Sequence, residues 1–129
     1  MTIMVAVPDS VEGRRALEAA VDEAVLRSTD LVVVNLALHP LDTSVVPDEL
    51  PFRVVERVED LDATELVLET LARQEQEHPV DLLVIGMKRR SPVGKAVLGS
   101  LSQRLLLDAP VAVLAVKTRS AVRVPAAAD

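Results

Sequence analysis

The sequence contains no cysteine, a single aromatic residue (Phe52) and only four glycines among its 129 residues. The lack of cysteine excludes disulfide bonds, thiolate metal sites and thiol catalysis. The near absence of aromatic side chains leaves no stacking surface for single-stranded nucleic acid. The core must therefore be built from Val, Leu, Ile and Ala.

Positive charge is also scarce. The formal net charge is −6, and duplex binding depends on Lys and Arg residues that neutralise phosphates, so we expect no nucleic-acid partner. No apolar run approaches the roughly 20 residues that a membrane-spanning helix requires. The N-terminal stretch MTIMVAVPDS has no basic region of the kind found in signal peptides. These absences predict a cytoplasmic protein with no membrane partner.

Short apolar runs alternate with amphipathic stretches along the chain. Five runs are typical of strands: residues 2–7, 31–38, 51–59, 81–87 and 111–117. Three stretches are typical of helices: residues 10–27, 62–77 and about 100–107. Ser10 and Asp62 are the expected N-caps. The expected inward-facing residues of the two longer helices are Leu17, Val21, Val25, Leu66, Leu71 and Ala72.

This alternation predicts one α/β domain over residues 1–117, with helices on both faces of its sheet. The third strand is expected at or near an edge. Only about 12 residues, 39–50, separate the second strand from the third, so this crossover is predicted to be a loop or one helical turn. Residues 118–129 are small and polar, and we expect them to form a flexible C-terminal tail.

Residues 86–100, GMKRRSPVGKAVLGS, hold three of the four glycines and four cations. A strand, a glycine-containing loop and a helix in succession present main-chain N–H groups and the positive end of a helix dipole to an anion. Gly86 is expected to end the strand and to let a ligand approach the backbone. The N–H groups of Gly99 and Ser100, with the hydroxyls of Ser100 and Ser102, can face phosphate oxygens.

The alternative interpretation of this stretch is a solvated loop whose glycines only make turns. The P-loop pattern is not matched, because Arg89 stands where its first glycine belongs and Ala96 follows Lys95. The G-x-G-x-x-G fingerprint of dinucleotide-binding proteins is absent after the first strand. Spacing alone therefore leaves both interpretations open.

Residues 86–117 resemble the C-terminal third of the universal stress protein family, and residues 5–24 resemble its first strand and helix. Nucleotide-binding members carry glycine, two residues, glycine, nine residues, and then glycine followed by Ser or Thr. Gly86, Gly99 and Ser100 match the first and last elements of this motif. The resemblance implies an open five-stranded parallel sheet in the order 3-2-1-4-5, with a ligand crevice beside strands one and four.

The resemblance also implies a binding site for an adenine nucleotide, either AMP or ATP with Mg²⁺. The residues expected at this site are Asp9, Leu36, Gly86, Arg89, Gly99, Ser100, Leu101 and Ser102. The main chain of Leu36 would contact adenine, and the residues near 99 would contact phosphate and ribose. Because Arg89 replaces the middle glycine, its side chain either fills space needed by a triphosphate or pairs with phosphate. Because Pro8 replaces an acidic residue, Asp9 either takes over a ribose contact or that contact is lost.

Two functional hypotheses follow from the resemblance. In the first, the protein is a stress-response regulator that binds an adenine nucleotide or another phosphorylated small molecule at residues 86–100. In the second, it is a dimeric interaction module of the same fold that binds no nucleotide. Under both, the last strand, 111–117, is expected to pair with a second copy of itself, since an exposed edge strand needs cover. The short crossover, where the family normally has a helix, would leave the pocket more open.

The sequence gives no support for catalysis or metal binding. His39 and His78 lie far apart and neither has a paired ligand, so no metal site is predicted. The acidic run 56–65 is interpreted as a solvated turn in preference to a site for a divalent ion. No nucleophile, base and orienting residue form a recognisable set, so no catalytic residue is predicted. Slow ATP hydrolysis or autophosphorylation would first require that ATP binds.

Overall fold

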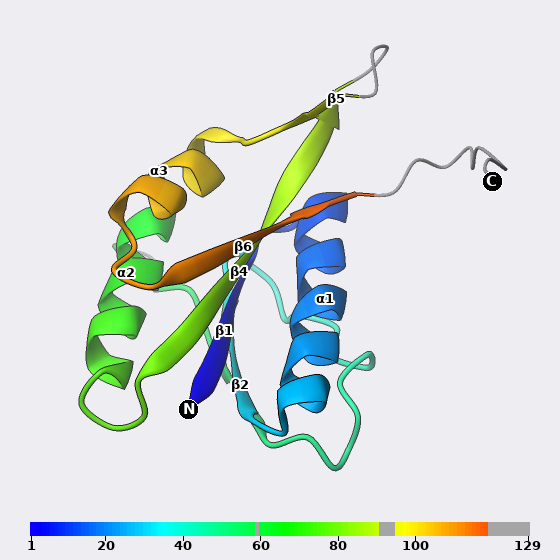
Figure 1. Cartoon of the computed structure of the whole chain (residues 1–129). Coiled ribbons are helices and arrows are strands. Elements are labelled where there is room, and N and C mark those ends of the chain that lie inside the picture. Colours follow the sequence, from blue (N-terminus) through cyan, green and yellow to red (C-terminus); the bar gives the residue numbers. More distant parts are fainter. Residues whose placement is uncertain (59, 91–94, 119–129) are drawn as a thin grey trace, which may run out of the picture.

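A parallel β-sheet forms the centre of the molecule, with helices packed against both of its faces (Figure 1). The computed structural model describes residues 1–58, 60–90 and 95–118. The elements in chain order are β1 (Thr2–Val7), α1 (Val11–Arg27), β2 (Asp30–Asn35), β3 (Phe52–Val55), α2 (Ala63–Gln74), β4 (Val80–Arg90), β5 (Lys95–Val97), α3 (Ser100–Asp108) and β6 (Ala112–Lys117). Within these described residues, no helix is both long enough and apolar enough to span a bilayer.

The five parallel strands lie in the order β3-β2-β1-β4-β6. This is the predicted order 3-2-1-4-5 once the short antiparallel strand β5 is set aside. Strand β1 lies at the centre and is buried along its whole length, as expected for a parallel strand covered on both faces. The predicted fold class and topology are therefore confirmed, and β3 lies at an edge as expected.

Alternate residues of the strands enter two apolar layers. One layer packs Ile3 and its neighbours against α1, through residues such as Leu17. The other packs Met4 against α2 and α3, through residues such as Leu66 and Leu105. Helix α1 therefore covers one face of the sheet, while α2 and α3 cover the other (Figure 1).

Most of the predicted inward-facing residues of α1 and α2 are buried. These are Leu17, Val21, Leu66 and Leu71. Val25 is 55% exposed and Ala72 is also exposed, so those two predictions are wrong. Each step of four residues carries a helix about 40° past a full turn, so a stripe at this spacing drifts away from the core. Ala24, which is fully buried, takes the place expected for Val25.

Asn35 ends β2 earlier than the predicted residue 38. The side chain of this buried residue accepts a hydrogen bond from the Ala37 N–H at 3.0 Å. Its amide group donates to the main-chain oxygen of His39 at 3.0 Å and to Glu56 Oε1 at 2.9 Å. These bonds turn the chain out of the sheet after β2 and also hold the residue that follows β3. Strand β3 accordingly ends at Val55 and not at residue 59.

Residues 36–51 connect β2 to β3 through turns and without a helix, as predicted. Val46 and Leu50 are buried and anchor this segment in the layer that contains α1. The predicted flexible tail, apart from Thr118, falls outside the described residues.

Strand β4 continues beyond Gly86 as far as Arg90. Its last residues, 88–90, pair in antiparallel register with residues 95–97 of β5. The resulting two-stranded ribbon projects beyond the helices, at the top right of Figure 1. The predictions that residues 86–100 form one loop and that Gly86 ends the strand are therefore wrong.

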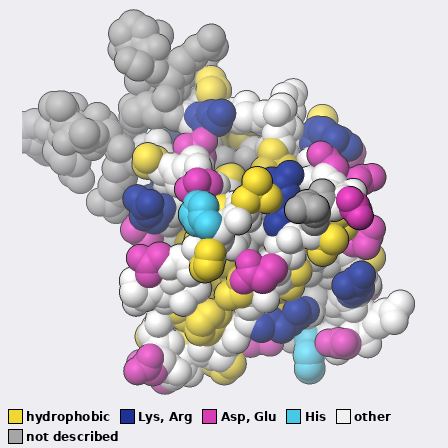
Figure 2. Space-filling view, turned by 180° about the vertical axis from the view of Figure 1, so that it is seen from behind, with side chains coloured by type: hydrophobic (Ala, Val, Ile, Leu, Met, Phe, Trp, Pro, Cys, Tyr) yellow, Lys and Arg dark blue, Asp and Glu magenta, His cyan; other side chains and the backbone are white. Residues whose placement is uncertain are grey.

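Charges of both signs are mixed on the surface. On the face shown in Figure 2, Lys and Arg side chains are interspersed with Asp and Glu and form no continuous basic patch. This distribution agrees with the acidic net charge of the chain.

Candidate functional site

The carboxyl ends of the parallel strands meet at one edge of the sheet, and the strand order reverses beside β1. Ligands of such sheets bind in the crevice outside these ends. Three segments form the edge here: residues 8–10 after β1, residues 36–40 after β2, and the connection from β4 to α3. Asp9, Leu36 and Gly99 come from these segments, Gly86 and Arg89 lie within β4, and Ser100, Leu101 and Ser102 begin α3. The topology therefore brings them to a common edge.

Gly86 is required by packing against α1. A Cβ atom at Gly86 would lie 2.4 Å from the main-chain oxygen of Glu12 and 2.8 Å from its carbonyl carbon. The main-chain oxygen of Gly86 accepts a hydrogen bond from Ser102 Oγ at 3.0 Å. Helix α1 thus fills the space that the sequence analysis had assigned to a ligand, and Ser102 uses its hydroxyl to hold α3 against β4.

The first turn of α3 has no side-chain cap. Its N-cap residue, Gly99, supplies no acceptor, whereas Ser10 and Asp62 cap α1 and α2 as predicted. Ser100 is exposed, and the Lys88 side chain lies beside Gly99, with Cε 3.4 Å from where a Cβ atom of that residue would be. The first N–H groups of a helix have no partner within it. These N–H groups and the Lys88 ammonium together create a region of positive electrostatic potential at the start of α3.

The remaining predicted residues near α3 are placed less favourably. Leu101 is half-buried, and its side chain packs in the layer of α2 and α3. Arg89 lies in the ribbon, opposite Ala96. Main-chain groups that bond across this ribbon are unavailable to a ligand, so fewer amides face the edge than a loop would provide. The Arg89 side chain, on which two interpretations were left open, lies outside the described part of the structure.

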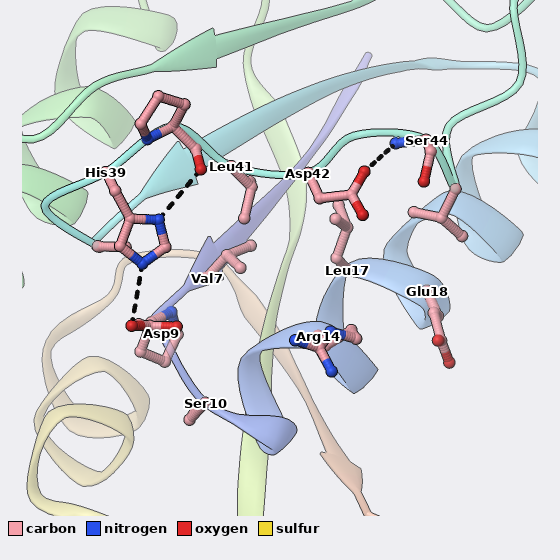
Figure 3. A pocket seen from close by; sticks show the side chains of 14 residues that line it. Val7, Asp9, Ser10, Arg14, Leu17, Glu18, His39, Leu41, Asp42 and Ser44 are labelled. Atoms are coloured by element: carbon pink, nitrogen blue, oxygen red, sulfur yellow. Dashed lines mark hydrogen bonds and ion pairs between the residues drawn. The ribbon is translucent and has the colours of Figure 1, made fainter.

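Asp9 pairs with His39 across the ends of β1 and β2 (Figure 3). Asp9 Oδ2 lies 3.0 Å from His39 Nε2, and both side chains are more than half exposed. This hydrogen bond, together with the contact between His39 Nδ1 and the Pro40 oxygen at 3.1 Å, raises the pKa of His39 above its ordinary value of 6.5. The negative charge of Asp9 acts in the same direction.

Leu36 is buried, and both of its main-chain polar groups have partners. Its N–H donates to the Val7 oxygen at 3.0 Å, and its oxygen accepts from Arg57 Nη1 at 2.9 Å. An adenine that contacts the Leu36 oxygen must share this oxygen with Arg57 or displace Arg57. Sequence reasoning missed Arg57 and the pairing of His39, and no motif points to either. Only their position after neighbouring strands could have suggested the contacts.

A cavity of about 320 Å³ opens beside the Asp9–His39 pair, on the face covered by α1 (Figure 3). Residues of α1 line one side, and residues between 37 and 45 line the other. A second hollow, of about 310 Å³, shares His39 and Pro40 with the first and extends to Glu56 and Arg57. The Asp9–His39 pair therefore lies where these hollows meet.

Metal ligands do not cluster in the structure. No group of three or more His, Asp and Glu side chains able to hold a metal ion occurs within residues 1–58, 60–90 and 95–118. His39 is engaged with Asp9, and His78 lies after α2, where its N–H donates to the Gln74 oxygen at 2.9 Å. What the edge offers to a ligand is therefore hydrogen-bond donors and charge.

This strand order, with a helix that begins beside the switch point, defines a class of α/β proteins that bind ligands at the carboxyl edge. The model of the universal stress protein family matches residues 67–117. A universal stress protein of Mycolicibacterium smegmatis (strain ATCC 700084 / mc(2)155) is 38% identical over 120 residues, which cover 81% of this chain and 88% of that protein. The chain belongs to the universal stress protein family.

Solved structures of this family share the fold. The universal stress protein from Archaeoglobus fulgidus in complex with dAMP matches with a TM-score of 0.60 and 19% identity, over 91% of this chain and 98% of that one. A universal stress protein in complex with cAMP matches with a TM-score of 0.58 and 20% identity, over 92% of this chain and 98% of that one. At this level of identity, the likeness establishes the fold alone.

Proposed function

We propose that this protein is a stress-response regulator that binds an adenine nucleotide, or a similar phosphorylated small molecule, at the carboxyl edge of its sheet. The observation that carries the proposal is the uncapped first turn of α3 beside Lys88. Main-chain N–H groups at a helix N-terminus and a nearby ammonium are the donors that a phosphate requires. Two proteins of the same fold are described as complexes with dAMP and cAMP, which is consistent with such a ligand.

The β4–β5 ribbon favours a ligand with one phosphate group over a triphosphate. Antiparallel pairing of residues 88–90 with 95–97 removes main-chain donors that an open loop would offer. Among the residues that the structure describes in this part of the chain, main-chain donors remain at the start of α3, near Lys88. A single phosphate can be satisfied there, whereas two further phosphates would need donors that the ribbon has already engaged.

The nucleoside part of the ligand must compete with two internal contacts. A ribose hydroxyl that bonds Asp9 shares this carboxylate with His39 or replaces it, and an adenine amino group that bonds the Leu36 oxygen shares this oxygen with Arg57 or replaces it. The His39 contact is exposed and the Arg57 contact is partly buried, and exchanging one hydrogen bond for another changes the free energy little. We therefore expect binding of moderate affinity that strengthens when either contact is removed.

A second candidate function is supported by these same contacts. If Asp9 and Leu36 keep their internal partners, the edge is closed to nucleosides and the domain acts as an interaction module. Strand β6 pairs only with β4 among the described residues, which leaves one of its sides open to a copy of itself. A homodimer through β6 is compatible with either function.

Calorimetric titration with AMP, cAMP and Mg-ATP, together with mass spectrometry of ligands released from the purified protein, tests the proposal. AMP should bind more tightly than Mg-ATP. Lys88→Met should weaken AMP binding about tenfold, because it removes a charged donor. Arg73→Met, at the far end of α2, is the matched control and should leave the affinity unchanged.

One further variant distinguishes the candidate functions. Arg57→Gln frees the Leu36 oxygen and should strengthen AMP binding if adenine is read there. A protein that is purified empty, and that shows no heat of binding with any of the three nucleotides even as Arg57→Gln, would exclude the first function. Sedimentation equilibrium at micromolar concentration then shows whether a dimer, as the second function requires, is present.

A further inference from the structure

The cavity beside α1 lies on the opposite face of the sheet from α3, so it is separate from the proposed phosphate site. It forms where residues 36–51 cross between β2 and β3 without a helix. A parallel crossover usually carries a helix, and that helix would lie next to α1 on this face. The turns of residues 36–51 cover less of the face and leave a space of about 320 Å³.

The inner wall of the cavity is apolar. Val7, Leu17 and Ala37 line it and are each almost completely buried. Leu41 and Val45 line its outer part and remain partly exposed. A cavity of about 150 Å³ is enough to hold a benzene ring. The space beside α1 can therefore take an apolar group of ring size together with a polar head.

Five charged side chains line the cavity, and four of them already have partners. Asp9 and His39 pair with each other. Asp42 accepts from the Ser44 N–H at 3.0 Å, and this bond lowers the pKa of Asp42. Glu18 lies 3.9 Å from Arg15, which is outside the cavity.

The fifth charged side chain is Arg14, whose guanidinium makes no ion pair within 4 Å and no hydrogen bond with any residue that the structure describes. Its positive charge is near enough to Asp42 to contribute to the lowered pKa of that carboxyl. Arg14, Leu17 and Glu18 are three and four residues apart, so they share one face of α1, and all three line the cavity. Leu17 points toward the segment that follows β2 (Figure 3). The Ser10 hydroxyl, which accepts from the Gly13 N–H at 3.1 Å, keeps its own hydrogen available for donation. A cation and a hydroxyl donor thus lie at the mouth of an apolar space.

We propose that this cavity is a binding site for a small organic carboxylate with an apolar body. The guanidinium of Arg14 offers two parallel donors, which match the two oxygens of a carboxylate. The carboxylates of Glu18 and Asp42 lie on the same rim and repel a doubly charged phosphate more strongly than a single negative charge. The apolar body enters between Leu17 and Leu41, where it displaces water from a largely non-polar wall.

Titration of the ¹⁵N-labelled full-length chain with sodium phenylacetate, followed by NMR, tests this proposal. We expect saturable shifts of amides that line the cavity, among them those of Leu17, Ala37 and Ser44. The neutral analogue phenylacetamide should bind at least about tenfold more weakly, because it lacks the charge that Arg14 recognises. Arg14→Gln should weaken phenylacetate binding to the level of the amide.

Arg27→Gln is the matched control, because Arg27 lies on the same helix but outside the cavity and is paired with Glu23. It should leave the affinity for phenylacetate unchanged. The proposal is overturned if phenylacetate gives no saturable shifts, if acid and amide bind equally well, or if Arg14→Gln binds like the wild-type protein. Shifts confined to Lys88 and the first turn of α3 would also overturn it, since they would place the anion at the other site.

Discussion

Replacing Gly86 with alanine tests whether packing, and not ligand access, explains this glycine. The added Cβ atom would lie 2.4 Å from the Glu12 oxygen and 2.8 Å from its carbonyl carbon. Both atoms belong to the main chain of α1, which cannot rotate away as a flexible side chain would. Overpacking of this kind usually costs 1–3 kcal/mol, and we expect about 3 kcal/mol because backbone has to move. The melting temperature should fall by about 10 °C for a chain of this size.

Urea denaturation of the ligand-free protein is the appropriate assay, and Gly99→Ala is the matched control. A Cβ atom at Gly99 would meet only the Lys88 side chain at 3.4 Å, and the φ angle of −72° suits any residue. Gly99→Ala should therefore cost less than about 1 kcal/mol, mainly through the poorer N-cap. If Gly86→Ala is as stable as the wild-type protein without ligand, the packing argument fails and a role in ligand access regains support.

Three further predictions concern single contacts. In an NMR titration, the pKa of His39 should lie above 6.5 and return toward 6.5 in Asp9→Asn. Because the folded-state pKa of His39 is raised, its pairing with Asp9 stabilises the fold fully below pH 6.5. This stabilisation is lost as the pH rises through the raised pKa. An identical titration of His39 in both proteins would contradict this. Asp62→Ala removes the acceptor for two N–H groups of α2 and should lower the free energy of unfolding, measured in urea, by about 1 kcal/mol. Asp60→Ala is the control at an exposed neighbouring residue and should change this free energy by less than about 0.5 kcal/mol. Leu105→Ala removes the one buried side chain of α3 and should lower the free energy of unfolding by about 3 kcal/mol in the same assay. Leu107 is 74% exposed, so Leu107→Ala is the control and should lower it by less than about 1 kcal/mol.

Local patterns were sufficient to predict every element except β5, whereas the strand order came from the resemblance to the universal stress protein family. Apolar runs mark the buried parallel strands, and Ser10 and Asp62 mark the helix starts. Strand ends were placed less well, because Asn35 ends β2 through bonds to Ala37, His39 and Glu56. The last of these partners is 21 residues away in the chain, so no local pattern encodes it.

The β4–β5 ribbon was missed for a different reason. Residues 88–90 are all cationic, so they show no alternation of polar and apolar side chains that would identify a strand. Main-chain groups form their pairing with residues 95–97, and the pattern of side chains carries no information about this pairing. Gly86 correctly indicated a close approach to the backbone. Only the three-dimensional structure shows whether a ligand or another part of the chain makes that approach. Here it is the carbonyl of Glu12.

The contacts at the carboxyl edge have a common consequence for ligands on both faces of the sheet. The Leu36 oxygen, the Asp9 carboxylate and the Gly86 oxygen each already accept one hydrogen bond from within the protein, so these three acceptors are partly satisfied without a ligand. Among the described residues, two groups of donors at this edge have no hydrogen-bond or ion-pair partner, namely the Arg14 guanidinium on one face and the first turn of α3 with Lys88 on the other. Anion binding at either proposed site depends on these donors. Because the protein as a whole is acidic, such binding requires that local positive charge outweighs the net charge at these two places.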